Sequence, residues 1–302
     1  MTNPTTLTFA SPSAAAADGI AVVFAEEGNR FSPAAQHLDK KTKGLLRHAA
    51  KISGFNGKKG ASVDVLAPQG VKFARIFLVG LGKPKDFAND DWINLGGAVR
   101  GKLTGREGDT AHVYLEAART EISPDDAADF ALGAQLRSYN FDKYKSKKPE
   151  KDSDAKTLKK LVLHYADPRA GTRAYGQERA VLNGVNFARD LVNEPANVLN
   201  PAEFASRTKA LTKAGVQVTI LSEAQMKRLG MGALLAIGQG SENPSHIAVM
   251  QWRGGGQKGG EPIAIVGKGV TFDTGGISLK PAGGMEDMKG DMGGAACVAG
   301  LM

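Results

Sequence analysis

The stretch RIFLVGLGK, residues 75–83, decides the class of the fold. Its first five residues are rich in apolar and β-branched side chains, and such a run predicts a strand. The glycines that follow, in GLGK at 80–83, indicate a turn where that strand ends. Two runs of the same kind, IAVVFA at 20–25 and SVDVL at 62–66, predict strands on its N-terminal side.

Helical patterns alternate with these strands along the first half of the chain. Apolar residues at helical spacing predict helices over 88–103 and 123–136, and Ser123 is a suitable N-cap for the second one. Short apolar runs at 112–115 and 161–164 predict further strands. Strands that alternate with helices of this length imply an α/β domain with a mainly parallel sheet.

The second half of the chain predicts another α/β unit. Helices are expected at about 172–192, 202–214 and 223–229, and strands at 216–221, 246–252 and 263–267. The composition from 139 to 160 is polar and lysine-rich, so we place the domains at 1–165 and 166–302. The last stretch, 288–302, reads as the start of an apolar helix without a cap. We therefore expect the second domain to be cut short.

Composition limits the class of protein. The 302 residues are 42% hydrophobic and 23% charged, as in an ordinary globular protein, and no apolar run approaches the ~18 residues needed to span a bilayer. One cysteine and an N-terminus without signal-peptide features favour a cytoplasmic location. The net charge of +8 owes much to one lysine-rich run that we interpret as a solvated linker. That run comprises Lys143, Lys145, Lys147, Lys148, Lys151, Lys156, Lys159 and Lys160.

The residues that carry chemistry lie in VGKGVTFDTGGISLKPAGGMEDMKGDMGGAA, residues 266–296. An apolar strand is expected to run into a glycine-rich loop that holds Lys268, Asp273 and Lys280, with Asp291 near the start of a helix. In open α/β sheets ligands bind beyond the carboxyl ends of strands, where these residues fall. Carboxylate oxygens suit Mg²⁺, Mn²⁺ and Zn²⁺, a deprotonated lysine can ligate a cation, and a protonated lysine can polarise a carbonyl.

Other catalytic motifs are absent or misplaced. The sequence contains no P-loop, no HExxH and no GxSxG, and its five histidines are scattered without ligand spacing. GxGxxG occurs at Gly254, Gly256 and Gly259, but a strand rather than a helix is expected after it, so a dinucleotide site is not expected there. Cys297 lies in an apolar helical stretch, which favours buried packing over a nucleophile.

Residues 266–296 resemble the first metal-binding segment of the leucine aminopeptidase family of cytosolic metallopeptidases. ARDLVNEPANVLNPAEFA at 188–205 and MGALLAIGQGS at 231–241 are also similar to that family, and YNFDKYK at 139–145 resembles its interdomain region. The resemblance implies a smaller N-terminal α/β domain followed by the first part of an α/β metallopeptidase catalytic domain. It also implies peptide substrates with a free N-terminus and a homo-hexamer for the full-length protein.

The resemblance assigns roles to four residues. Lys268 would ligate one metal through its neutral amine, Asp273 would bridge both ions, and Asp291 would bind the same ion as Lys268. Lys280 would be the catalytic electrophile that holds the scissile carbonyl. The implied cofactors are two divalent cations, Mn²⁺ or Zn²⁺ with Mg²⁺ as the alternative. The implied reaction is release of N-terminal, preferentially leucine-like, amino acids by metal-activated water.

One departure from the family bears on activity. The family's second motif, Asn-Thr-Asp-Ala-Glu-Gly-Arg, does not occur in these 302 residues, and it normally adds two carboxylate ligands and an arginine. Lys268, Asp273 and Asp291 are too few to close two cation sites, so we expect weak metal binding and doubtful activity of this chain alone. The alternatives are a catalytically dead fragment that serves as a binding or assembly module, and a relative that binds nucleic acid through its lysine-rich run.

Overall fold

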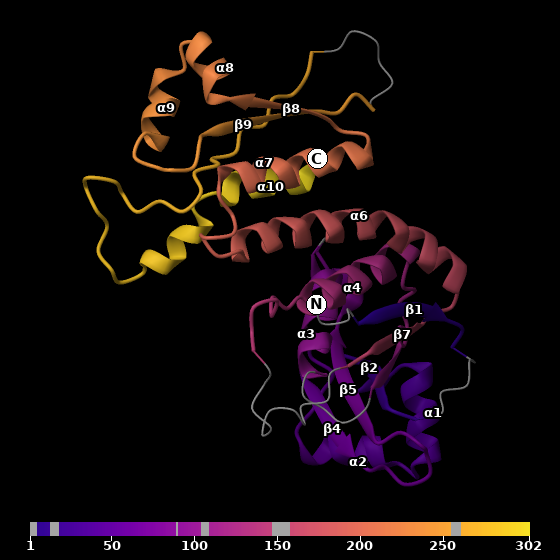
Figure 1. Ribbon diagram of the computed structural model, residues 1–302. Coiled ribbons are helices and arrows are strands. Elements are labelled where there is room, and N and C mark those ends of the chain that lie inside the picture. Colours follow the sequence, from indigo (N-terminus) through magenta and orange to yellow (C-terminus); the bar gives the residue numbers. More distant parts are fainter. Residues whose placement is uncertain (1–4, 13–17, 89, 104–108, 147–157, 255–260) are drawn as a thin grey trace. The chain divides into compact units, whose positions relative to one another are not determined.

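The computed structural model describes residues 5–12, 18–88, 90–103, 109–146, 158–254 and 261–302. The chain divides into two compact units, Met1–Leu182 and Asn183–Met302 (Figure 1). The long helix α6, Pro168–Asn193, contains the boundary and confirms the helix expected at about 172–192. Four of the eight lysines of the lysine-rich run, Lys147, Lys148, Lys151 and Lys156, lie outside the described residues. Among the described residues, no helix is long and apolar enough to cross a bilayer.

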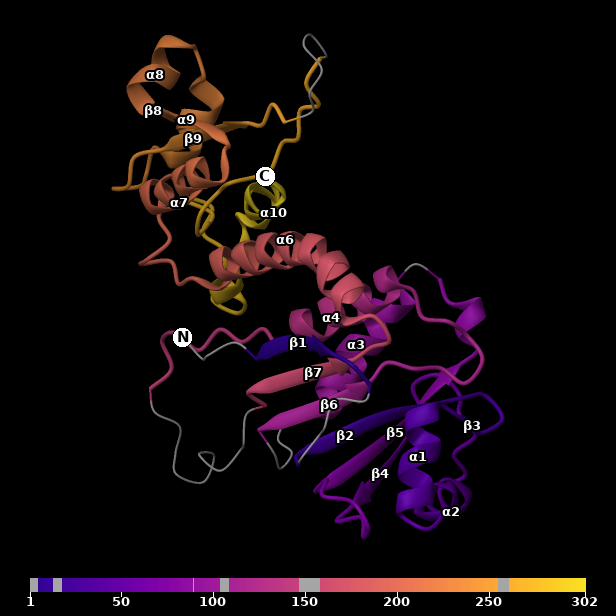
Figure 2. The ribbon, with the colours of Figure 1, turned by 90° about the vertical axis from the view of Figure 1, so that its right-hand side faces the viewer.

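A mainly parallel sheet forms the centre of the first unit, as the sequence predicts. Its strands are β1 Thr6–Ala10, β2 Ile20–Glu26, β3 Arg30–Phe31, β4 Ser62–Leu66, β5 Arg75–Gly82, β6 Thr110–Tyr114 and β7 Lys160–His164. The order is β1-β7-β6-β2-β5-β4, with β3 paired to β2 (Figure 2). The neighbouring pairs β1–β7, β7–β6, β6–β2 and β2–β5 are parallel. The pairs β4–β5 and β3–β2 are antiparallel.

Helices cover both faces of this sheet, and the central strand β2 shows why they must. Ile20, Val22 and Phe24 belong to one apolar core with α3, Asp91–Lys102, and α4, Pro124–Arg137. The alternate residues of β2 belong to a second core with α1, Pro33–Lys41, and α2, Leu45–Ile52. Since side chains alternate along a strand, a strand with no polar face requires cover on both sides. Each large side chain buried in this way contributes about 1.5–3 kcal/mol.

Two glycines allow α3 and α4 to pack with their backbones in contact. A Cβ atom on Gly133 would collide with the carbonyl of Ile93, and one on Gly96 would collide with the carbonyl of Phe130. Small residues at such a crossing let two helices approach more closely than larger side chains permit. The α3/α4 layer is therefore fixed by backbone contact as well as by apolar packing.

The start of α4 confirms the cap expected from the sequence. The Ser123 side chain accepts a hydrogen bond from the Asp126 backbone N–H at 3.1 Å, and the Asp126 carboxylate accepts one from the Ser123 backbone N–H at 3.0 Å. This reciprocal arrangement satisfies two amides that the helix cannot pair internally. Pro124 at the first helical position has no amide hydrogen to satisfy. The helix consequently begins where the sequence predicts.

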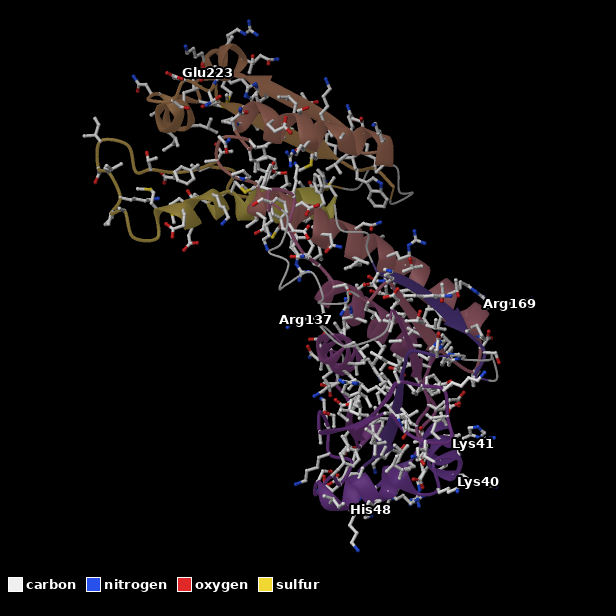
Figure 3. The ribbon with its side chains drawn as sticks, turned by 60° about the horizontal axis from the view of Figure 1, so that its bottom comes forward. Lys40, Lys41, His48, Arg137, Arg169 and Glu223 are labelled. Atoms are coloured by element: carbon white, nitrogen blue, oxygen red, sulfur yellow. The ribbon has the colours of Figure 1, made fainter. Side chains whose placement is uncertain are left out.

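The second unit is smaller and has a two-stranded antiparallel sheet of β8 and β9. Its elements are α7 Pro201–Lys209, the 3₁₀ helix η2 Ala210–Ala214, β8 Gln217–Ser222, α8 Glu223–Arg228, α9 Gly232–Gly238, β9 His246–Gln251, the 3₁₀ helix η3 Met285–Gly290 and α10 Gly293–Leu301. Glu223, labelled in Figure 3, accepts the backbone N–H of Ser245 at 2.9 Å and so ties α8 to the start of β9. Leu191, Met292 and Ala296 are core residues that connect α6 with the α10 region.

Three sequence predictions differ from the structure. The strand expected at 263–267 is wrong, because no described strand pairs with it and the side chains of Ile263 and Val266 are 91% and 94% exposed. An apolar run becomes a strand only where a neighbour satisfies its backbone. Cys297, expected to be buried, is exposed on α10. The turn expected at 80–83 begins later, because β5 continues to Gly82.

Candidate metal centre

Backbone contact between two glycines positions the loop that precedes α10. A Cβ atom on Gly267 would lie 2.5 Å from the carbonyl oxygen of Gly294, and the Ala295 N–H donates to the Lys268 carbonyl oxygen at 2.9 Å. Only glycine allows so close an approach. Lys268 is thereby held beside the turn that leads into α10, where Asp291 ends η3.

The four predicted site residues form two lysine–carboxylate pairs. Lys268 Nζ lies 2.5 Å from Asp291 Oδ1, and Lys280 Nζ lies 2.9 Å from Asp273 Oδ2. Lys280 also contacts the sulfur of Met288 at 3.1 Å. Both lysine–carboxylate contacts are charge-assisted hydrogen bonds. The fold therefore brings together Lys268 and Asp291, which are 23 positions apart, and Asp273 and Lys280, which are 7 positions apart.

Asp273 is held in its ionised form. The hydrogen bond from Lys280 is the largest influence that lowers the pKa of the Asp273 carboxyl group. The Gly275 backbone N–H, 2.8 Å from Asp273 Oδ1, lowers it further, and the charge of Lys268 acts in the same direction. Each partner favours the charged carboxylate over the neutral acid. Asp273 therefore presents the anionic oxygens that hard cations bind.

Asp291 has an oxygen that its surroundings leave unsatisfied. Its Oδ1 binds Lys268, but its Oδ2 is buried and has no hydrogen-bond partner among the described residues. A buried acceptor without a partner costs about 1–3 kcal/mol, and more when it is charged. A cation at this oxygen would remove that cost. The observation fits a metal ligand better than a purely structural ion pair.

The donor set fits part of a metal centre. Asp273 and Asp291 offer carboxylate oxygens and Lys268 offers an amine, which suits divalent cations once that amine is deprotonated. Among the described residues, no group of three or more His, Cys, Asp and Glu side chains comes together to hold a metal. The chain thus brings a few ligands together without enclosing an ion.

Sequence reasoning named the charged residues of this loop but missed the groups that position them. Met288 was passed over because a methionine in an apolar pattern carries no catalytic signature, yet its sulfur contacts Lys280. The contact between Gly267 and Gly294 was also missed. The glycine pairs on either side of the charged residues were the available signal, because repeated glycines mark close backbone approach.

Comparison with known proteins defines the class. A sequence model described as "Cytosol aminopeptidase family, catalytic domain" matches residues 186–302, and one described as "Cytosol aminopeptidase family, N-terminal domain" matches residues 22–148. Together they leave unmatched only the first residues and the stretch between them. The chain belongs to the cytosol aminopeptidase family.

Curated relatives agree with this assignment. The chain is 46% identical over 292 residues to a probable cytosol aminopeptidase of Rhizobium leguminosarum bv. trifolii, covering 97% of this chain and 58% of the relative. It is 52% identical over 261 residues to a probable cytosol aminopeptidase of Agrobacterium fabrum, covering 86% of this chain and 52% of the relative. The chain thus spans little more than half the length of these relatives.

Solved structures show the same fold. A mutant of tomato leucine aminopeptidase matches with a TM-score of 0.78 and 29% identity, over 99% of this chain and 59% of that one. The bottromycin maturation enzyme BotP in complex with Mn matches with a TM-score of 0.68 and 28% identity, over 94% of this chain and 55% of that one. The mixed α/β fold, with an N-terminal domain and the beginning of a catalytic domain, is therefore confirmed.

Proposed function

We propose that Lys268, Asp273, Lys280 and Asp291 are this chain's share of a two-metal aminopeptidase centre that releases leucine-like N-terminal residues from peptides. Membership of the cytosol aminopeptidase family supports the reaction class. The unpartnered, buried Oδ2 of Asp291 is the single observation that carries the metal assignment. The Mn complex of the structurally similar BotP supports a divalent ion.

Each side chain has a task that follows from its surroundings. Asp273, ionised by its neighbours, and Asp291, with a free oxygen, present carboxylates to the ions. When bound, divalent cations supply a nucleophilic water at neutral pH and polarise the substrate carbonyl. Lys280, held by Asp273 and Met288, donates a hydrogen bond to the carbonyl oxygen as negative charge develops there.

The ligands set the affinity that this chain can reach. Two carboxylates and one amine leave most coordination positions of two ions to water, and the amine must lose a proton before it ligates. The 302-residue chain is therefore expected to bind Mn²⁺ weakly and to give no robust turnover of a chromogenic leucine substrate. Robust turnover with added Mn²⁺ would show that these residues suffice and would overturn the ligand count.

Metal binding tests the centre without relying on activity. Free Mn²⁺ is measured by electron paramagnetic resonance while the 302-residue chain is titrated into the ion. We expect Asp291→Asn to weaken binding about tenfold or more, since it removes an anionic ligand. The matched control is Asp287→Asn, because Asp287 is exposed on η3, which Asp291 directly follows; this variant should bind Mn²⁺ as the wild type does. Equal affinities of both variants, or no binding by the wild type, would contradict the assignment.

A further inference from the structure

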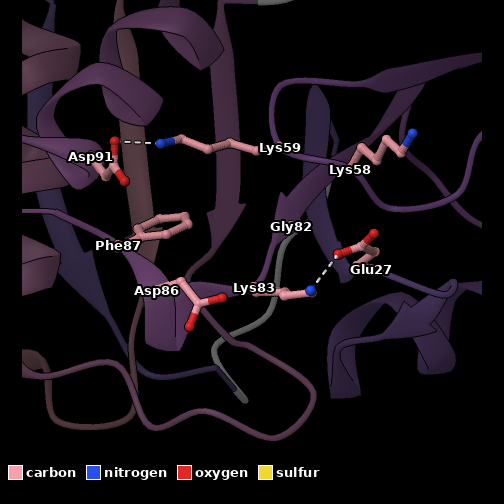
Figure 4. Close-up of a pocket in the computed structure, with 8 residues that line it drawn as sticks. All are labelled: Glu27, Lys58, Lys59, Gly82, Lys83, Asp86, Phe87 and Asp91. Atoms are coloured by element: carbon pink, nitrogen blue, oxygen red, sulfur yellow. Dashed lines mark ion pairs between the residues drawn. The ribbon is translucent and has the colours of Figure 1, made fainter.

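A second charged site lies in the first unit, at the carboxyl ends of the adjacent parallel strands β2 and β5. The pocket has a volume of about 260 Å³ and combines charged side chains with one aromatic ring (Figure 4). It is lined by Glu27, Lys58, Lys59, Gly82, Lys83, Asp86, Phe87 and Asp91. Ligands of open α/β sheets bind beyond the carboxyl ends of the strands, which is where this pocket lies.

The walls of the pocket are set by backbone contacts. The Gly82 N–H donates to the Gly57 carbonyl oxygen at 2.8 Å, and the Glu27 N–H donates to the Gly82 carbonyl oxygen at 2.8 Å. A Cβ atom on Gly57 would collide with the carbonyl of Glu26, and its φ of +76° favours glycine. The loop that carries Lys58 and Lys59 is therefore fixed against the ends of both strands.

The charges of the lining residues cancel. Three lysines face three carboxylates, so the pocket has no net charge to attract a phosphate dianion. Lys59 pairs with Asp91 and lies 4.8 Å from the centre of the Phe87 ring. The hydrogen bond from Lys59 is the main cause that lowers the pKa of Asp91, which stays anionic. This pair is already satisfied.

The remaining charges are available to a ligand. Lys83 Nζ and Glu27 Oε2 are 3.7 Å apart, too far for a hydrogen bond, and their side chains are 60% and 41% exposed. Lys58 and Asp86 have no ion-pair partner among the described residues. Figure 4 shows the Lys83–Glu27 pair and the Lys59–Asp91 pair on different sides of the pocket, with the Phe87 ring between Asp91 and Asp86. Both signs of charge thus border one small apolar surface.

We propose that this pocket binds a free α-amino acid as its zwitterion. Lys83 would take the carboxylate, Glu27 and Asp86 the ammonium group, and Phe87 the apolar side chain. A ligand that carries one charge of each sign inserts into a long ion pair and satisfies both members of it. The inference stands apart from the proposed function, because every residue in it lies in the first unit.

Ligand-observed NMR on the metal-stripped 302-residue chain tests the pocket. EDTA in the sample removes metal-dependent binding at the loop of residues 266–296. L-leucine is expected to bind saturably, whereas leucinamide, N-acetyl-leucine and inorganic phosphate should each bind at least ten times more weakly. Leucinamide lacks the carboxylate charge and N-acetyl-leucine lacks the ammonium charge. Inorganic phosphate carries negative charge only and is not a zwitterion.

Variants assign the binding to this pocket. Glu27→Gln and Lys83→Gln should each weaken leucine binding about tenfold and leave the circular dichroism spectrum unchanged, since neither side chain is buried. Lys40→Gln is the matched control, because Lys40 lies in the last turn of α1, is exposed and does not line the pocket (Figure 3). The proposal is overturned if wild-type leucine binding is absent, if phosphate binds as well as leucine, or if the two pocket variants bind like the control. The Mn²⁺ titration reports separately on the proposed metal centre.

Discussion

His112 should make the first unit lose stability as the pH falls below neutrality. This histidine on β6 is only 9% exposed, and its Nδ1 lies 2.9 Å from Nε2 of His164 on β7. His164 Nδ1 lies 2.9 Å from the carbonyl oxygen of Ser11, which can only accept a hydrogen bond. We therefore assign a hydrogen to His164 Nδ1, which donates it to the Ser11 carbonyl oxygen. His112 Nδ1 then carries the hydrogen that it donates to His164 Nε2. Protonating His112 adds a charge to this packed pair.

The magnitude follows from the pKa of His112, which lies at about 4, below the ordinary value of 6.5. Burial is the main cause, and the neighbouring His164 and Lys160 lower the pKa further, while Asp18 raises it. The Phe73 ring lies beside His112, and the Tyr114 ring stacks on His164.

The direction of the effect follows from proton binding. Above the unfolded pKa both states are neutral and the stability is fully present. As the pH falls towards the folded pKa, the unfolded chain binds a proton that the folded chain refuses, so stability is lost. Between about pH 7.5 and about pH 5 this loss amounts to roughly 2 kcal/mol.

Urea denaturation measures this loss. Trp92 fluorescence reports on the first unit, because Trp92 is buried there, whereas Trp252 in the second unit is already 63% exposed. Wild type should lose about 2 kcal/mol between these pH values, and His112→Gln should lose much less, because it has no proton to bind. His48→Gln, on the exposed face of α2, should retain the wild-type slope.

The reasoning is refuted if wild type has the same stability at both pH values. It is also refuted if His112→Gln and His48→Gln show the same slope. Should His112→Gln fail to fold, an NMR titration of the wild-type His112 ring gives an independent answer. A midpoint near 6.5 in the folded protein would contradict the burial argument.

Two further predictions concern the helices of the first unit. Gly133→Ala should destabilise that unit by about 2 kcal/mol or more, because its new methyl group meets the Ile93 carbonyl and forces α3 and α4 apart. The control is Gly176→Ala, because Gly176 lies on α6 with open space around it. Equal melting temperatures of the two variants would count against the contact. Ser123→Ala should cost about 1 kcal/mol in urea denaturation through loss of the α4 cap, and no measurable change would mean that the cap is replaced by solvent.

Helices and strands were predicted correctly where the local sequence pattern agrees with the packing of the element in the fold. The strands at 62–66 and 20–25 were located within a residue, since β-branched residues favour strands both at 62–66, where every second residue is buried, and at 20–25, where all are buried. β1 and the helices α1 and α2 were not predicted, because these short elements are decided by the partners they pack on. The strand expected at 263–267 fails for the same reason, since no described strand pairs with it.

The candidate site shows the same division. Residue types and glycine spacing singled out Lys268, Asp273, Lys280 and Asp291, and the structure shows which lysine meets which carboxylate. Pairing across 23 residues depends on how the chain returns to α10, which no local pattern specifies. The amino-acid pocket had only a weak signal, the lysines that follow glycines at 57–60 and 82–83.

The contact between Gly267 and Gly294 has a thermodynamic consequence for anything that binds beside Lys268 and Asp291. Because the two backbones touch, the main chain beside Lys268 is held close to the main chain that leads from Asp291 into α10. The conformational entropy of joining residues 23 positions apart is consequently lost when the chain folds, before any ligand arrives. When an ion binds, only the side chains of Lys268 and Asp291 then lose conformational freedom, which lowers the entropic cost of binding.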